Sequence, residues 1–331
     1  MATTVISAFN EFMQDVVNLK KSITDEARGS RDWLIDKLNA FEKDESSPFN
    51  YPEIHIGFGS FARRTKIRPL DDIDLMFGLS AEGCTYTIYS DKITLNSHEG
   101  ATRLKGFKSS SSETISSIRI LNHFKSKLKD IPQYELADIK RNQEAVTLKL
   151  TSKDWNFDIV PCFRTAEDSW GRSYYLIPDG SGNWKKTDPR IDKARTTEIN
   201  VNNKGNMLNV IRAVKYWQSI KSIPSIGSYL LETMILNYYE GRDNCSQFVD
   251  MELAGLFNHL GLHVLSMVND HKGIQGDINH LSWEERIKVS SKFYSEATLV
   301  NEARQFEIDK EQEKSINKWR EVFGSSFPSF G

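Results

Sequence analysis

The sequence predicts an α+β protein in which a lobe built on a mixed sheet is followed by a helical lobe. Three observations predict this class. Short runs of strand-forming residues alternate with turns between residues 51 and 205, and helical periods follow one another from residue 206 to 323. A further helical period fills much of residues 1–50, and we expect it to form a long helix that braces both lobes.

The composition agrees with a soluble protein of two lobes. The chain has 331 residues, more than the ~100–200 of a usual domain, and its 39% apolar residues are enough for a core. The three cysteines are far apart, so they form neither a disulfide framework nor a zinc site. There is no signal-peptide pattern and no apolar run of ~20 residues, so we expect a cytoplasmic protein without membrane contact. A net charge of −2 argues against binding to duplex nucleic acid.

The first half of the chain begins with helix and continues with strands. Apolar residues recur at three- and four-residue steps over residues 4–42, which predicts helix with a break at Gly29-Ser30, closed by Pro48 and Pro52. An extended stretch over residues 53–58 then leads into Gly59-Ser60, and the alternating residues 72–77 predict a strand. A helix is expected over residues 113–129, followed by antiparallel strands over 146–150 and 155–160.

Three aspartates on two of these strands are the predicted catalytic and metal-binding residues. Asp72 and Asp74 point to the same side of their strand because side chains alternate, and Asp158 stands between apolar neighbours on another strand. Carboxylates among apolar residues are costly unless they are paired or bind metal. Two Mg²⁺ ions, with Mn²⁺ as a substitute, suit such a trio and serve phosphoryl transfer. The alternative is an ordinary Asp-x-Asp pair on a surface turn.

The Gly59-Ser60 pair is the predicted phosphate-binding turn. Gly59 lets the backbone approach a ligand closely, and the Ser60 hydroxyl adds a donor to the N–H groups of the short helical turn expected next. The alternative is that Ser60 only caps that turn.

The second half of the chain predicts helices over about 206–221, 228–240, 250–269 and 282–322. Before them, the polar segment 164–206 carries a predicted turn at residues 178–183. Residues 324–331, rich in glycine and serine, are expected to form a flexible tail.

The motifs together resemble those of the CD-NTases, the bacterial relatives of cyclic GMP–AMP synthase within the polymerase β-like nucleotidyltransferase superfamily. The resemblance covers roughly residues 50–240, through Gly-Ser-Phe-Ala-Arg (59–63), Asp-Ile-Asp-Leu (72–75), Phe-Asp-Ile-Val-Pro (157–161), Arg-Ala-Val-Lys-Tyr-Trp (212–217) and Pro-Ser-Ile-Gly-Ser-Tyr-Leu-Leu-Glu (224–232). It implies that Lys215 and Ser228 bind a donor triphosphate and that Tyr229 stacks on the donor base. For Lys215 the alternative is an exposed helical lysine without a ligand, and for Tyr229 it is an aromatic residue of the core.

The resemblance implies a synthase that joins two or three nucleoside triphosphates, such as ATP and GTP, into a cyclic second messenger for anti-phage (CBASS) signalling through a separate effector. A cyclic purine dinucleotide such as cyclic GMP–AMP is the expected product, and Arg195 and Asn200 are candidates for gripping the second nucleotide. The sequence lacks the zinc insertion and the excess of basic residues found in nucleic-acid-sensing relatives, so we expect no activation by nucleic acid. The family also implies conjugation of Gly331 by an E1/E2-like protein. Two alternatives remain open: nucleotide transfer to RNA or protein, and a non-catalytic nucleotide-binding scaffold.

Overall fold

A computed structural model describes residues 2–110 and 112–331, and the chain divides into two compact units. The sheet unit comprises Ser22–Ala62 and Leu70–Pro189. The helical unit comprises Met1–Lys21, Arg63–Pro69 and Arg190–Gly331, so it takes in two short stretches that come before most of the sheet in the chain. No local pattern in the sequence indicates this assignment of the early segments, because it depends on contacts that are distant in the chain.

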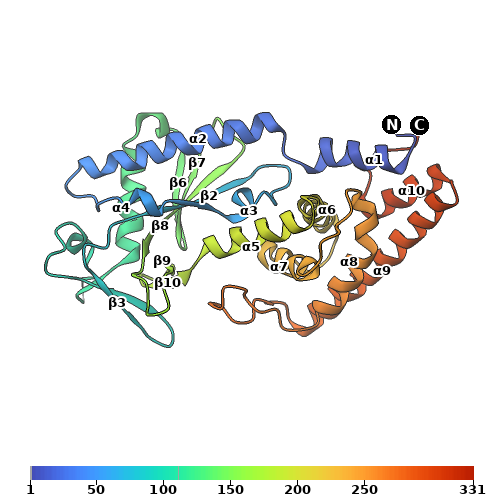
Figure 1. Ribbon diagram of the computed structural model, residues 1–331. Helices are drawn as coiled ribbons and strands as arrows, with labels where there is room; N and C mark the ends of the chain where they lie inside the picture. Colours follow the sequence, from blue (N-terminus) through green and yellow to red (C-terminus); the bar gives the residue numbers. More distant parts are fainter. Residues whose placement is uncertain (1, 111) are drawn as a thin grey trace. The chain divides into compact units, whose positions relative to one another are not determined.

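The sheet unit combines ten strands with helices α2 and α4 (Figure 1). Its helical elements are α2 (Lys21–Asn39), η2 (Ala40–Lys43), η3 (Pro52–Ile54), α3 (Gly59–Ala62), η4 (Leu104–Phe107), α4 (Ser117–Lys129) and η5 (Pro132–Tyr134). Its strands are β1 (Ile56–Phe58), β2 (Asp72–Gly78), β3 (Thr85–Ile88), β4 (Ile93–Asn96), β5 (Thr114–Ile115), β6 (Asp138–Asn142), β7 (Ala145–Lys149), β8 (Asn156–Arg164), β9 (Tyr175–Pro178) and β10 (Trp184–Thr187).

One long strand, β8, organises the sheet. The strand order is β1-β2-β8-β9-β10-β4-β3, and the β6–β7 hairpin also joins β8. The β2–β8 pair is parallel, whereas the other pairs among the described strands are antiparallel. Helix α4 packs on this sheet through Phe124, whose ring lies 5.7 Å from that of Phe77 on β2. The predicted strand at 72–77 and the antiparallel pair at 146–150 and 155–160 are confirmed.

The helical unit is built around a continuous apolar core. Its elements are α1 (Val5–Phe12), the π-helical turn η1 (Met13–Val17), α5 (Pro189–Asn202), α6 (Met207–Ile220), α7 (Ser228–Tyr239), α8 (Val249–His263), α9 (Trp283–Ile308) and α10 (Gln312–Phe323). Trp217 of α6 stacks on Phe293 of α9 and contacts Phe257 of α8. In Figure 1, α8, α9 and α10 run side by side in this unit.

The N-terminal helix breaks at a different place from the one expected. Helix α2 runs without interruption through Gly29, whose missing side chain leaves open space around it. The break falls instead at residues 18–20, after the π-helical turn. Asn18 is extended there, with ψ 142°, and pairs with Ile67, while Arg68 donates to the carbonyl groups of Gln14 and Asp15. Tertiary contacts therefore end the helix where its own sequence does not.

The segment 324–331 was expected to be flexible, but in the structure it is packed. Phe327 is fully buried, and its ring lies 5.0 Å from the rings of both Phe9 and Phe12. Arg320 donates to the Phe327 carbonyl, and the Ala2 amide donates to the carbonyl of Ser329. The glycine and serine content predicted mobility, but one phenylalanine side chain that enters the core outweighs it.

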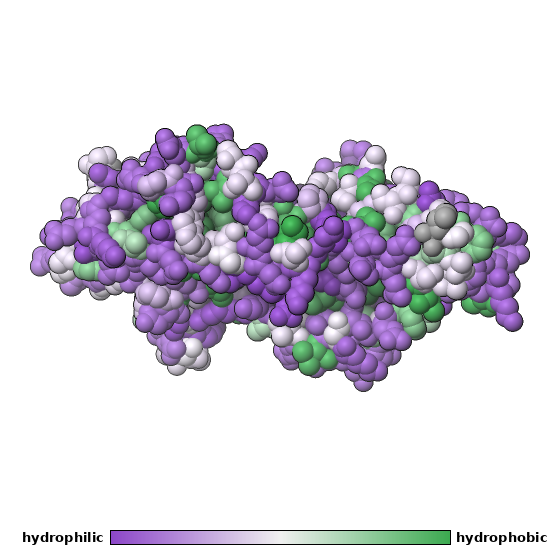
Figure 2. Space-filling model, turned by 90° about the horizontal axis from the view of Figure 1, so that it is seen from above, coloured by the Kyte–Doolittle hydropathy of each residue, from purple (hydrophilic) through white to green (hydrophobic). Residues whose placement is uncertain are grey.

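The face seen in Figure 2 is mostly hydrophilic, with apolar side chains in small scattered groups. Over the described residues, none of the helices combines the length and the hydropathy that crossing a membrane requires.

Candidate active site

Backbone register places the three predicted aspartates on one face of the sheet. In the parallel β2–β8 pair, Asp74 lies opposite Asp158 and Asp72 lies opposite Asn156. Partner residues in a ladder project to the same face, and Asp72 and Asp74 share a face because they are two residues apart. The intervening Ile73 projects to the other side and is buried. The apolar core thus fixes one face of these strands and leaves the other to three half-buried carboxylates.

Gly59 brings the backbone directly against one of these carboxylates. Strand β1 pairs with β2 so that Phe58 lies opposite Asp74, and the chain turns into α3 at the next residue. Gly59 has φ +69°, a region that residues with a side chain rarely adopt. A Cβ atom on Gly59 would lie 1.7 Å from Asp74 Oδ2, so any side chain at this position would displace the carboxylate. Ser60 follows in the first turn of α3 and is half-buried.

A threonine that the sequence analysis did not identify orients Asp158. Thr147 lies opposite Asp158 in the β7–β8 ladder, and its hydroxyl donates to Asp158 Oδ1 at 2.5 Å. A hydrogen bond to a charged acceptor is stronger than one between neutral groups, so it holds the carboxylate in one rotamer. Only the strand register shows this pairing, and a single threonine in a strand carries no signal of it.

The three carboxylates suit a hard divalent cation, although they are not gathered around a preformed cage. Their oxygens are the ligands that Mg²⁺ and similar ions prefer. In the part of the chain that the structure describes, no three acidic, histidine or cysteine side chains stand close enough together to form a complete ligand set. The register places the three aspartates on one face of the two neighbouring strands.

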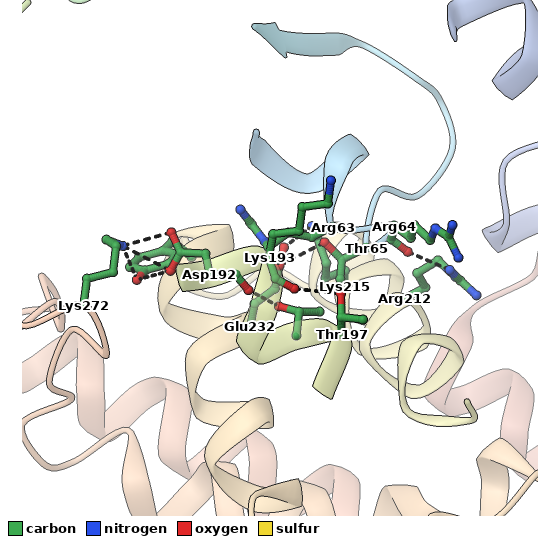
Figure 3. A network of polar contacts seen from close by, with 12 residues as sticks. Arg63, Arg64, Thr65, Asp192, Lys193, Thr197, Arg212, Lys215, Glu232 and Lys272 are labelled. Atoms are coloured by element: carbon green, nitrogen blue, oxygen red, sulfur yellow. Dashed lines mark hydrogen bonds and ion pairs between the residues drawn. The ribbon is translucent and has the colours of Figure 1, made fainter. Parts of the chain in front are cut away.

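Lys215, a predicted triphosphate ligand, lies in a buried ion network of the helical unit (Figure 3). Its ammonium group is 2.7 Å from Glu232 Oε1, while Arg63 Nε and Thr65 Oγ1 reach Glu232 Oε2 at 3.0 and 2.9 Å. Burial raises the pKa of Glu232, but Arg63 and Lys215 outweigh burial and hold that pKa below its usual value. Glu232 is therefore an ionised buried carboxylate that ties α6 and α7 to the segment 63–69.

Ser228 and Tyr229, the other predicted nucleotide contacts, open helix α7. Ser228 is exposed at the first helical position, and no side chain caps this helix end. Free N–H groups at a helix N-terminus favour an anion. The Tyr229 hydroxyl lies 2.9 Å from Asp192 Oδ1 and 2.7 Å from Asp270 Oδ1. Burial, followed by these carboxylates, raises the pKa of Tyr229 far above its usual value, so the phenol stays protonated.

The two candidates for a second nucleotide have structural partners within the helical unit. Arg195 is 7% exposed and donates to Asn237 at 2.7 Å and to Glu240 at 2.9 Å. The Asn200 carboxamide oxygen accepts the amide hydrogen of Leu208. Their contacts stabilise the helices that surround them.

The predicted site residues thus form two groups, each complete within its own unit. The sheet unit brings together Asp72, Asp74 and Asp158 with Gly59 and Ser60. The helical unit holds Lys215, Ser228 and Tyr229, which lie in the helices α6 and α7. The sequence did not indicate the roles of Thr147 and Glu232 in these groups, because each acts through a partner on another element.

Comparison with known proteins identifies the family. No family model matches the chain. A probable cyclic nucleotide synthase of Bacillus cereus (strain VD146) is 44% identical over 334 residues and covers 99% of each chain. A cyclic AMP-AMP-AMP synthase of an Acinetobacter strain is 25% identical over 63% of this chain and 60% of its own length.

Solved structures show the same fold. CdnC of Escherichia coli MS115-1, solved with ATP, has a TM-score of 0.70 at 16% identity, covering 98% of this chain and 99% of its own. The Vibrio cholerae cyclic AMP-GMP synthase DncV has a TM-score of 0.67 at 11% identity, covering 99% of this chain and 98% of its own. The chain belongs to the CD-NTases, the bacterial nucleotidyltransferases related to cyclic GMP–AMP synthase, which make cyclic oligonucleotides by metal-dependent nucleotidyl transfer.

Proposed function

We propose that this protein is a cytoplasmic synthase that joins two or three purine nucleoside triphosphates into a cyclic oligonucleotide, releasing one pyrophosphate for each bond formed. The alignment of Asp72, Asp74 and Asp158 on one face of β2 and β8 carries the proposal. The names of its relatives support a cyclic product of adenine with or without guanine nucleotides, as a dinucleotide or a trinucleotide. Cyclic GMP–AMP remains our expected product among these.

Within the sheet unit, each residue has a distinct proposed role. Asp72, Asp74 and Asp158 would hold two Mg²⁺ ions, with Mn²⁺ as a substitute, which would neutralise the triphosphate and lower the pKa of the attacking hydroxyl. Asp158, oriented by Thr147, accepts the proton of that hydroxyl. Gly59 offers the phosphates a backbone without an intervening side chain, beside the carboxylate of Asp74, and Ser60 adds its hydroxyl as a donor.

Within the helical unit, the start of α7 is the proposed donor-nucleotide site. Ser228 and the uncapped N–H groups beside it bind phosphate, and the Tyr229 ring stacks on the base. Lys215 contributes positive charge to the triphosphate site. Its ammonium group is paired with Glu232, so the phosphate must compete with Glu232 for it. Arg195 and Asn200 have structural roles in our proposal, because their polar groups are already paired.

The proposed biological role is anti-phage signalling, in which the cyclic product activates a separate effector. CdnC of E. coli has been solved in a complex with a HORMA protein, which supports a protein partner for the present chain as well. Conjugation of Gly331 stays a prediction.

Product analysis tests the proposal directly. Purified protein is incubated with Mg²⁺ and mixtures of ATP, GTP, CTP and UTP, the reaction is treated with phosphatase, and the surviving product is identified by mass. We expect a phosphatase-resistant cyclic oligonucleotide that disappears in the double variant Asp72→Asn/Asp74→Asn. The variant Asp154→Asn, an exposed aspartate in the turn before β8, is the matched control and should keep its activity.

The same experiment separates the alternatives. Consumption of triphosphates with only linear, phosphatase-sensitive products would favour a transferase that extends RNA or modifies protein. If no triphosphate is consumed in any mixture, with Mg²⁺ or with Mn²⁺, the cyclase proposal is contradicted.

A further inference from the structure

A lysine in the loop between α8 and α9 contacts the hydroxyl edge of the aromatic ring that we assign to the nucleobase. Lys272 Nζ stands 4.1 Å from the centroid of the Tyr229 ring and also contacts the Tyr229 hydroxyl. The same ammonium group is 3.1 Å from Asp192 Oδ2 and 3.1 Å from Asp270 Oδ1. Figure 3 shows Lys272 reaching from its loop to Asp192 at the start of α5. Lys272 therefore connects its own loop with α5, through Asp192, and with α7, through Tyr229.

The loop holds this lysine firmly. The Asp270 carboxylate accepts the backbone N–H groups of Lys272, Ile274 and Gln275, and the Asp270 amide donates to the Gly276 carbonyl at 2.7 Å. The Lys272 side chain is only 3% exposed. Burying an ammonium group is costly unless it is well paired, and here two carboxylates and the Tyr229 hydroxyl provide the pairing. Such an arrangement gives Lys272 a fixed position relative to the ring.

Proton counting shows why the cluster needs the lysine. The phenol of Tyr229 has a single proton, yet two carboxylate oxygens lie within 2.9 Å of its oxygen atom. Burial raises the pKa of Asp270, but the hydrogen bonds from Tyr229 and Lys272 outweigh burial and hold that pKa at about 2. Both donors favour the ionised form of this carboxylate. Without the ammonium group, Asp192 and Asp270 would repel each other across a phenol that can donate to only one of them.

We propose that Lys272 is a positioning residue of the nucleobase site: it anchors Tyr229 by its hydroxyl edge and so fixes the plane of the ring on which a base would stack. This inference rests on the proposed function, which assigns the donor base to Tyr229. It adds the α8–α9 loop to the nucleotide site and gives the carboxylates of Asp192 and Asp270 a role there. A ring that is held at its hydroxyl presents a fixed stacking surface, which lowers the entropy lost when the base binds.

Removing the lysine should weaken nucleotide binding without affecting the reaction step. For Lys272→Met we expect the KM for the donor triphosphate to rise about tenfold, with kcat changed by less than about twofold, because base stacking is lost and the phosphate and metal groups are untouched. Lys272→Arg keeps the positive charge at the hydroxyl edge of the ring and should recover most of the lost affinity. Lys288→Met, an exposed lysine on α9, is the matched control and should behave as wild type.

Comparison of two ligands separates positioning of the base from direct phosphate binding. The affinities of wild type and Lys272→Met for a non-hydrolysable ATP analogue and for inorganic tripolyphosphate are measured by calorimetry. Positioning predicts weaker binding of the ATP analogue only. Equal losses for both ligands would show that Lys272 acts as a phosphate contact and would overturn the inference, and so would unchanged affinity for the analogue.

Two further controls keep the result interpretable. If Lys272→Met does not fold, Tyr229→Phe keeps the ring but removes its hydroxyl anchor, and it should show the same selective loss for the ATP analogue. If that selective loss is missing in a folded Tyr229→Phe protein, the inference is wrong. The binding assay does not depend on turnover. A wild-type protein that binds the analogue but makes no product would contradict the proposed function and leave the positioning role to be judged by the affinities alone.

Discussion

A methyl group added at Gly59 should disable the active site through a contact that the structure defines. In Gly59→Ala the new Cβ would lie 1.7 Å from Asp74 Oδ2 and 2.6 Å from Asp74 Cγ. Non-bonded carbon and oxygen atoms need more than 3 Å, so the carboxylate must move by more than ~1 Å, and displacements of that size cost about 10²-fold in rate. The alanine must also hold φ +69°, which adds a stability cost of ~1–2 kcal/mol.

Pyrophosphate release and thermal unfolding measure these two effects separately. We expect the release rate to fall by about 10²-fold and the melting temperature to fall by about 2–4 °C for each kcal/mol lost. Gly57→Ala is the matched control: Gly57 lies two residues earlier, in β1, and its Cβ would meet no atom closer than 3.9 Å. A Gly59→Ala enzyme that keeps half of the wild-type rate would refute the reasoning, because it would show that the position of the Asp74 carboxylate does not limit the reaction.

Three further changes test other parts of the structure. Glu232→Gln leaves two buried cations without their carboxylate and should lower the free energy of unfolding by about 3–5 kcal/mol, measured by denaturant unfolding. Because the pKa of Glu232 is lowered in the folded state, its stabilising contribution is present above pH ~4.5 and is lost as the pH falls below that value. The variant's stability should therefore depend less on acid pH, and an unchanged pH dependence would contradict the assignment. Thr147→Val removes the hydrogen bond to Asp158 and should lower kcat by about tenfold at unchanged stability; a wild-type kcat would mean that Asp158 needs no such support. Phe327→Ala should cost about 3–5 kcal/mol by leaving a cavity, whereas a flexible tail would tolerate it without loss.

The sequence predicted the helices and strands whose apolar residues recur with a clear period, and it missed those without one. Strand β2 alternates and β8 has an apolar run, so both were found, and with them the three aspartates. The polar segment 164–206 showed only its turn, where the Asp179 carboxylate accepts the amide hydrogens of residues 181–183. Strands β9 and β10 and helix α5 lie in that segment, and they are short or lack a clear apolar stripe. Their formation depends on the neighbours that cover them.

The missed site contacts share one physical cause. Thr147 meets Asp158 across a ladder, Glu232 meets Arg63 from a distant segment, and Lys272 reaches Tyr229 from a loop. Motif spacing locates residues that act on a ligand, whereas the residues that hold them in place are specified by register and tertiary packing. Sequence reasoning therefore named the expected ligands of substrate and metal but not their supports.

The parallel pairing of β2 with β8 also determines when the enzyme can first act. Asp74 and Asp158 are far apart in the chain, with strands β3 to β7 between them, so their meeting requires a long loop to close. Strand pairings of such high sequence separation form slowly, because the loop-closure entropy must be paid before the contact is made. A partly synthesised or partly folded chain has its Asp72 and Asp74 but not the strand that completes the trio. If the trio acts as we propose, synthesis of the cyclic product is thus restricted to molecules whose sheet has fully assembled, and an unfinished chain makes none.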